Sequence, residues 1–132
     1  MSKPVATPSE PQWIIDLNWL KTNRRSFTVL ARSSLCPKCR KKLKADTAEM
    51  NAVDAFKAIQ GCCSRSDGFI TQRLPFQETI FRVFLANGNK PMTLAELGEE
   101  LKRRRGPDGS RTSPEYLGRV LKGDVYYGIK PK

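Results

Sequence analysis

The sequence predicts a mainly α-helical protein with a short β-prone segment near its end. Three observations support this fold class. Apolar residues recur at spacings of three and four along several segments, which is the pattern of a helix with one buried face. Residue types that begin and end helices flank these segments. The composition, with 39% hydrophobic and 28% charged residues, suits a folded, soluble protein.

The length of 132 residues allows one ordinary domain or two small ones. We expect a disordered tail over residues 1–10, which are rich in Pro and Ser. A helical zinc-binding module is expected over residues 11–73 and a second helical module over residues 74–132. A module of about 60 residues buries only a marginal core, so a bound metal would add much of its stability.

Two helices are expected before the first cysteine. Trp13, Leu17 and Leu20 recur at helical spacing, which predicts a helix that begins near Trp13. Asn23 is a candidate cap for a second helix over residues 24–34. The segment SFTVLA is also compatible with a strand, and both interpretations stay open.

A third helix is expected to run from Asp46 to residue 60. Asp46 and Glu49 have the spacing of a capping box, and Gly61 stands where a helix stop belongs. The apolar stripe of this segment consists of Met50, Val53, Phe56 and Ile59.

Three more helices are expected in the second module. The first, within PFQETIFRVFLANGN, has Pro in its first turn and ends at NGN. In the second, Thr93 caps LAELGEELKRRR, and Glu96 completes a capping box. The third, TSPEYLGRVLKG, has Thr112 or Ser113 as its cap and Gly123 as its stop. The segment VYYGI that follows is β-prone.

The segments GNKPMTLAELGEEL and SPEYLGRVLKGDVYYGI resemble a winged helix-turn-helix of the HARE-HTH type. The first is similar to the Gly-x-x-Pro-hydrophobic-Thr-hydrophobic entry of many winged helices. The other segment resembles a recognition helix that runs into the first strand of a wing. The resemblance covers residues 74–130 and implies DNA binding, with the helix over residues 113–122 in the major groove. The loop over residues 105–111 is longer than in a tight helix-turn-helix.

The residue types of this third helix agree with a groove contact. With its apolar side inward, the opposite face presents Glu115, Tyr116, Arg119 and Lys122. Arg is well shaped for the edge of guanine in the major groove. Other residues around the helix suit phosphate contacts, namely Arg103, Arg104, Arg105, Arg111, Thr112 and Ser113. The alternatives are an ordinary solvated face and a protein-binding three-helix unit.

Four cysteines predict a structural zinc site. Cys36 and Cys39 form a C-x2-C pair, whose short turn directs two thiolates toward one tetrahedral ion. Cys62 and Cys63 are adjacent, so both can bind the same ion only if the backbone turns there. Such a site would join the first helices of the chain to the helix that ends near Gly61.

Three alternatives to a four-cysteine site stay open. A carboxylate such as Asp46 or Asp67 would replace one cysteine as the fourth ligand. A redox dithiol is the second alternative, but no strand-helix pattern of the thioredoxin kind surrounds Cys36. The third alternative is that the cysteines are buried or incidental and bind no metal.

The C-x2-C pair lies in a basic run, LCPKCRKKLK. Its cations form either a solvated face or a second surface that contacts phosphates. The latter interpretation keeps an RNA- or ribosome-associated protein as an alternative function. The candidate residues are Lys38, Arg40, Lys41 and Lys42.

The formal net charge of +11 favours a polyanionic partner, and we expect DNA more than RNA. Neither a membrane nor a small-molecule substrate is expected. The chain has no histidine and no GxxxxGK[ST] loop, so an enzyme is not expected. No signal peptide or bilayer-spanning segment is visible, which predicts a cytoplasmic protein with reduced thiols.

We therefore expect a small zinc-binding, DNA-binding protein that acts as a transcription regulator. The alternatives are an RNA- or ribosome-associated protein and an adaptor that docks on RNA polymerase.

Overall fold

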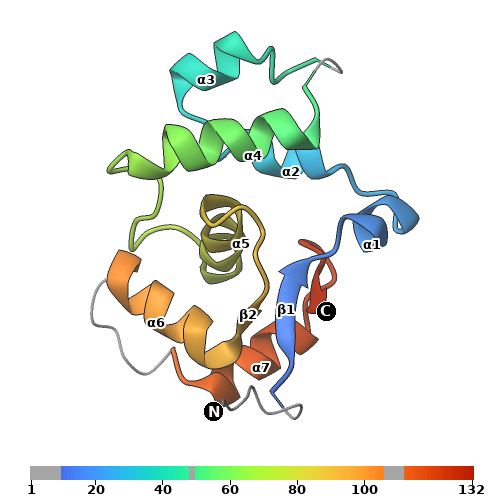
Figure 1. Ribbon diagram of the computed structural model, residues 1–132, viewed down its shortest axis with the longest axis vertical. Helices are drawn as coiled ribbons and strands as arrows, with labels where there is room; N and C mark the ends of the chain where they lie inside the picture. Colours follow the sequence, from blue (N-terminus) through green and yellow to red (C-terminus); the bar gives the residue numbers. More distant parts are fainter. Residues whose placement is uncertain (1–9, 48–49, 106–111) are drawn as a thin grey trace, which may run out of the picture.

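The computed structural model describes residues 10–47, 50–105 and 112–132. The predicted disordered tail lies outside these residues except for Glu10. The described part is mainly helical with one small antiparallel sheet, which confirms the predicted fold class (Figure 1). The elements are β1 (Gln12–Ile15), α1 (Leu17–Thr22), α2 (Phe27–Arg32), α3 (Pro37–Lys42), α4 (Ala52–Gly61), the 3-10 helix η1 (Cys63–Arg65), α5 (Phe76–Ala86), β2 (Met92–Thr93), α6 (Leu94–Arg105), α7 (Pro114–Lys122) and β3 (Ile129–Pro131).

The three strands form one sheet in the order β2-β1-β3. Strand β1 comes from the start of the chain but lies between two strands of its last third. Trp13 pairs with Met92 on one side and with Pro131 on the other. The side-chain amide of Asn89 extends this pairing, because it accepts from the Ile15 N–H at 2.8 Å and donates to the Ile15 carbonyl at 2.9 Å. The two predicted modules therefore share one sheet.

The prediction of a helix that begins near Trp13 is wrong for its first turn, because residues 12–15 form strand β1 instead. Trp13 and Ile15 are buried on one side of the strand, with the period of two that a strand requires. Asp16 then caps α1 by accepting a hydrogen bond from the Trp19 N–H at 3.0 Å. Leu17 is 40% exposed, so it does not belong to the buried stripe that its spacing indicated.

The second helix begins at Phe27, later than expected, because Ser26 caps it by accepting from the Val29 N–H at 3.2 Å. The strand alternative for SFTVLA is wrong. Asn23, the predicted cap of this helix, instead ends α1, where its side chain donates to the Trp19 carbonyl at 2.8 Å.

Helix α4 also begins later than expected. Its cap is Asn51, which accepts from the Asp54 N–H at 2.9 Å, so the predicted start at Asp46 is wrong. Glu49 of the expected capping box lies outside the described residues. Val53 is 60% exposed and does not contribute to the buried stripe.

The three helices expected in the second module are confirmed. Thr93 and Glu96 form a reciprocal capping box at the start of α6, with hydrogen bonds of 2.8 and 3.2 Å. Ser113 rather than Thr112 caps α7, because its hydroxyl accepts from the Tyr116 N–H at 3.2 Å. The β-prone segment was expected at VYYGI, but residues 125–128 form a loop, and strand β3, which pairs with β1, begins only at Ile129.

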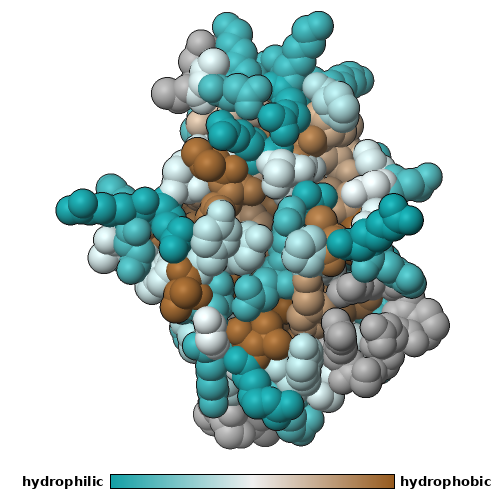
Figure 2. Space-filling model, turned by 180° about the vertical axis from the view of Figure 1, so that it is seen from behind, coloured by the Kyte–Doolittle hydropathy of each residue, from teal (hydrophilic) through white to brown (hydrophobic). Residues whose placement is uncertain are grey.

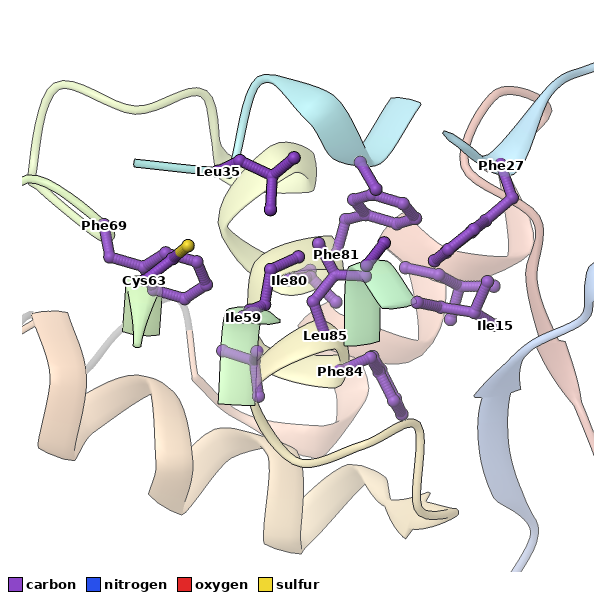
Figure 3. Close-up of a cluster of buried hydrophobic side chains, with 14 of the residues drawn as sticks. Ile15, Phe27, Leu35, Ile59, Cys63, Phe69, Ile80, Phe81, Phe84 and Leu85 are labelled. Carbon is purple, nitrogen blue, oxygen red and sulfur yellow. The ribbon is translucent and has the colours of Figure 1, made fainter. Parts of the chain in front are cut away.

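One hydrophobic core runs through the described elements, with α5 at its centre. Residues 79–85 of α5 are all buried, and α4 and α6 pack on α5 from either side (Figure 1). Figure 3 shows Cys63 beside Phe69 at one edge of this core, while Phe27 and Ile15 lie at the other edge. The domain boundary near residue 74 stays a prediction. No described helix is both long enough and apolar enough to cross a bilayer.

Arg82 on α5 joins two loops of the first half of the chain to this helix. Its guanidinium donates to the Phe69 carbonyl at 2.7 Å, to the Ser33 carbonyl at 3.1 Å and to the Glu78 carboxylate at 2.8 Å. The residue is only 8% exposed, so its two terminal nitrogens are satisfied inside the protein rather than by water, while its buried Nε has no hydrogen-bond partner.

The buried carboxylate of Asp124 organises the loop between α7 and β3. One oxygen accepts from the N–H groups of Tyr126 and Tyr127 at 3.0 and 2.9 Å, and the other accepts from the Ile129 N–H at 2.9 Å. The Lys130 ammonium donates to the Asp124 carbonyl at 2.7 Å. Because three backbone donors end on one side chain that is 2% exposed, the loop is held in a defined conformation.

The substitution Asp124→Asn is expected to lower the free energy of unfolding by about 2 kcal/mol, because an amide group then faces a backbone N–H that has lost its acceptor. Urea denaturation followed by circular dichroism measures this change. Asp67→Asn, at an exposed position, is the control and should change stability by less than about 0.5 kcal/mol. Equal stabilities of the two variants would contradict the role given to Asp124.

Candidate metal centre and basic surfaces

The structure brings the four cysteines together. Cys36 caps α3 and Cys39 lies within it, while Cys62 follows α4 and Cys63 begins η1. Their four sulfur atoms all lie within 4.8 Å of one another, and the group could hold a metal ion. Helix α3 was not expected from the sequence. It begins with Pro37 in its first turn and is built around the C-x2-C pair.

The spacing of the sulfur atoms fits a tetrahedral metal rather than disulfides. The Cys36 sulfur lies 3.8 Å from that of Cys62 and 3.6 Å from that of Cys63. Four sulfurs around a zinc ion at about 2.3 Å are separated from one another by about 3.8 Å. A disulfide needs about 2.05 Å, and all four cysteines are free thiols.

A break in the helix lets the adjacent pair reach one point. At Cys62 the backbone leaves the α-helical conformation, with φ −140° and ψ −66°, and a 3-10 turn follows. Cys62 is exposed and Cys63 is buried, so the two side chains approach the site from different sides. This is the backbone turn that the adjacent cysteines required.

Hydrogen bonds and burial act on the thiols in opposite directions. A hydrogen bond from the backbone of Cys39 lowers the pKa of Cys36 to about 7. Burial raises the pKa of Cys39 to about 12, and it also raises the pKa of Cys63. The Cys36 N–H donates to the Cys63 sulfur at 3.2 Å. A bound divalent cation would hold the buried sulfurs as thiolates, because metal ligation requires the deprotonated form.

The carboxylates considered as a fourth ligand do not join this group. Asp46 lies at 3.1 Å from the guanidinium of Arg40 and at 3.9 Å from that of Arg32. The metal-ligating group found among the described residues contains cysteines only, so it does not include Asp67.

Helix α7 presents its predicted contact residues in two different ways. Leu117 and Leu121 are buried, whereas Arg119 and Lys122 are exposed. Tyr116 is half-buried. Its ring packs on that of Phe76 at 5.8 Å and lies 5.9 Å from the Arg119 guanidinium. Tyr116 therefore supports the helix, and its exposed charged residues are the two cations and Glu115.

The two residues predicted to contact a phosphate at the start of α7 are partly used within the protein. Thr112 is buried, and the hydroxyl of Ser113 is used to cap the helix. The backbone of Gly98 in α6 lies against the Thr112 carbonyl, so closely that a side chain at Gly98 would clash with it. This contact fixes how α6 and α7 meet.

The arginines of α6 are already paired. Arg103 and Arg104 both interact with the carboxylate of Glu100, Arg103 directly and Arg104 at 3.8 Å. Burial also lowers the pKa of Arg104. The side chain of Arg105 and all of Arg111 lie outside the described residues. Glu100 would therefore compete with a phosphate group for the side chains of Arg103 and Arg104.

The basic run forms a second surface at the other end of the molecule. Figure 1 places α3 at the opposite end of the long axis from α7, and Figure 2 shows a hydrophilic surface at the end that carries α3. Lys38, Lys41 and Lys42 are exposed, whereas Arg40 pairs with Asp46. The predicted nucleic-acid residues thus fall on two separate surfaces.

A cavity of about 350 Å³ lies between α3 and α4, beside the cysteines. Lys57 and Asp54 of α4 line it together with Lys38 and Lys42 of α3. No local sequence signal indicated Lys57, because its place beside α3 depends on how the two helices pack.

Comparisons of the chain with protein-family models, with curated proteins and with solved structures found no match. Function must therefore be inferred from the residues themselves.

The four-cysteine group and the cations of α7 are two arrangements that could bind a ligand. The first consists of four soft ligands with no carboxylate or hydroxyl among them. The second consists of two exposed cations on a helix of nine residues whose other side is buried in the core. They lie in different halves of the chain, so one can be disabled without altering the residues of the other.

Proposed function

We propose that this protein binds DNA through α7 and that a structural zinc ion holds its four cysteines together. In this proposal, α5, α6 and α7 act as a winged-helix-like unit, with α7 in the major groove. The corresponding role is transcription regulation in the cytoplasm, where thiols stay reduced and available to the metal.

Zinc is the metal that the ligands favour. Thiolates are soft ligands, whereas Mg²⁺ and Ca²⁺ prefer oxygen. With four protein ligands around the ion, no position is left for a substrate, so the ion would have a structural role. It would cross-link α3 to the end of α4, two elements that are otherwise joined by a long connection.

The exposed cations of α7 are the observation that carries the proposal of DNA binding. Arg119 and Lys122 lie on the side of the helix opposite Leu117 and Leu121, and no acid pairs with either cation among the described residues. A helix fits the major groove, and an arginine on its exposed side can donate two hydrogen bonds to one guanine.

The double substitution Arg119→Gln and Lys122→Gln tests this proposal. It removes two charges and nearly keeps the length of both side chains. Binding of a fluorescent duplex of about 20 base pairs is expected to weaken on the order of tenfold at about 0.1 M salt. If both residues contact phosphates, the slope of log K against log salt falls by about 2, whereas a contact of Arg119 to a base changes the sequence preference.

The matched control removes two charges at the other end of the molecule. Lys38→Gln with Lys41→Gln has the same net charge as the test variant, so any difference between them reports position rather than charge. The proposal predicts that the control binds nearly as well as the wild type. If the control loses binding and the α7 variant does not, the basic surface of α3 is the nucleic-acid surface, as in the RNA- or ribosome-associated alternative.

A further inference from the structure

We propose that the nucleic-acid surface continues from α7 onto the first part of the chain, through the turn between α1 and α2 and the loop between α7 and β3. Its central residues are Arg24, Arg25 and Tyr126. The inference rests on the proposed function and names a part of the surface that the sequence did not indicate.

Contacts between the two segments place them on one surface. The Arg25 guanidinium lies 4.7 Å from the centre of the Tyr126 ring, and the Lys130 ammonium lies 4.5 Å from that of Trp19. The Asp16 N–H donates to the carbonyl of residue 128 at 2.7 Å. Figure 1 shows α1 beside the part of the chain that leads into β3. Helix α7 ends four residues before Tyr126, so the loop leads directly from that helix to this surface.

The loop presents apolar groups from a fixed backbone. Val125 is 69% exposed and Tyr126 is 46% exposed, although both follow the buried Asp124 whose carboxylate holds the loop. The two adjacent side chains give the loop a small exposed apolar area that a partner can cover. A loop that is already ordered loses little conformational entropy on binding, so it suits a contact surface.

The excess of positive charge on these two segments favours a polyanionic partner. Residues 16–26 and 114–132 together contain seven cations and three acids, which are Asp16, Glu115 and Asp124. Asp16 accepts from the Trp19 N–H and Asp124 from three backbone N–H groups, whereas Glu115 is exposed. The field at this surface is therefore dominated by cations, which attract phosphates.

The mixture of aromatic rings and cations on this surface suits a nucleic acid. Arginines bind the phosphodiester backbone, while an exposed tyrosine offers an apolar surface to a sugar or a base. Arg25 already lies over the Tyr126 ring, so one bound strand could contact both. A protein partner could also cover Val125 and Tyr126, so the excess of cations over acids is what favours a nucleic acid.

The test compares three variants of the full-length, metal-loaded protein with the same fluorescent duplex. Arg24→Gln with Arg25→Gln is expected to weaken binding on the order of tenfold at about 0.1 M salt and to reduce the salt slope by about 2. Tyr126→Ala is expected to weaken binding several-fold with an unchanged salt slope, because it removes no charge. Tyr126→Phe, which keeps the ring, is expected to bind like the wild type.

The outcomes separate this inference from the proposed function. If Arg119→Gln with Lys122→Gln weakens binding but Arg24→Gln with Arg25→Gln matches the α3 control, then α7 binds DNA and the extension is wrong. If Tyr126→Ala binds as well as the wild type, the loop is not part of the surface. If the protein binds no duplex at all, both proposals fail. Thermal melts of every variant, expected to match the wild type, exclude unfolding as the cause of a loss.

Discussion

Removal of the metal is expected to unfold the first half of the protein. Binding of a zinc ion to four cysteines contributes on the order of 10 kcal/mol to folding, which is comparable to the whole stability of a small protein. Helices α1, α2 and α3 have six residues each, whereas an isolated helix needs about 12 or more to persist in water. Helix α3 has Cys39 as its one buried residue, so the proposed zinc ion would be its main attachment to the core.

The measurement combines metal analysis with circular dichroism. The purified protein should contain one zinc ion per chain, and a strong chelator should lower the helical signal and abolish a cooperative melt. Cys36→Ser and Cys62→Ser should each lose the metal. Ser33→Ala, at an exposed position close to the site, is the control and should keep it. A metal-free protein that melts at the wild-type temperature would overturn the proposed zinc site.

The Cys62→Ser variant also decides between four ligands and three. The Cys62 sulfur lies 3.8 Å from that of Cys36, which is the spacing expected for two sulfur ligands of one zinc ion. A three-cysteine site would leave zinc bound, with only a moderate loss of affinity, when Cys62 is replaced. We expect instead that replacing Cys62 has as large an effect as replacing Cys63.

The second large effect is expected at Arg82. Its substitution by Met should lower the free energy of unfolding by about 3–5 kcal/mol, because the Glu78 carboxylate then remains as an uncompensated charge in a largely enclosed place. The carbonyls of Phe69 and Ser33 lose their donors at the same time. Urea denaturation of the metal-loaded protein measures the change.

A double-mutant cycle separates the lost ion pair from the lost carbonyl contacts. Adding Glu78→Gln to Arg82→Met should recover part of the stability, because the unpaired carboxylate is no longer present. Arg82→Lys should remain destabilised, since one ammonium cannot reach three acceptors in the geometry of a guanidinium. A stability loss below about 1 kcal/mol for Arg82→Met would contradict this account.

The sequence predicted the long helices well because their signals are local. The capping box of Thr93 and Glu96 and the cap at Ser113 depend on residues three positions apart, so they can be recognised without the fold. The apolar stripes of α5 and α7 likewise repeat over two or more turns.

The short elements could not be predicted in the same way. Strand β1 has four residues, and its partners lie near residues 92 and 130, so no local pattern specifies it. The spacing of Trp13, Leu17 and Leu20 suggested a helix, because a strand followed by a capped helix can bury residues at nearly the same intervals. Tertiary pairing decided between the two.

The candidate site was predicted in part. The C-x2-C spacing indicated a metal site, and the structure shows how the break after α4 brings in the adjacent pair. The pairing of Arg103 and Arg104 with Glu100 could have been inferred from their spacing of three and four on one helix. The contact between Arg25 and Tyr126 could not, because it joins segments about a hundred residues apart and depends on the whole fold.

The position of β1 also sets the order in which the protein can be completed during synthesis. Ile15 is made early, yet its partner Ile129 leaves the ribosome more than a hundred residues later. Both edges of β1 are unpaired until β2 is made, and one edge stays unpaired until β3 is made; such edges are prone to pair with other chains. The cysteines, by contrast, are all present once residue 63 has been made. Early metal capture would therefore give the nascent chain a folded segment while β1 still lacks its partners, and zinc depletion during expression should first cause aggregation.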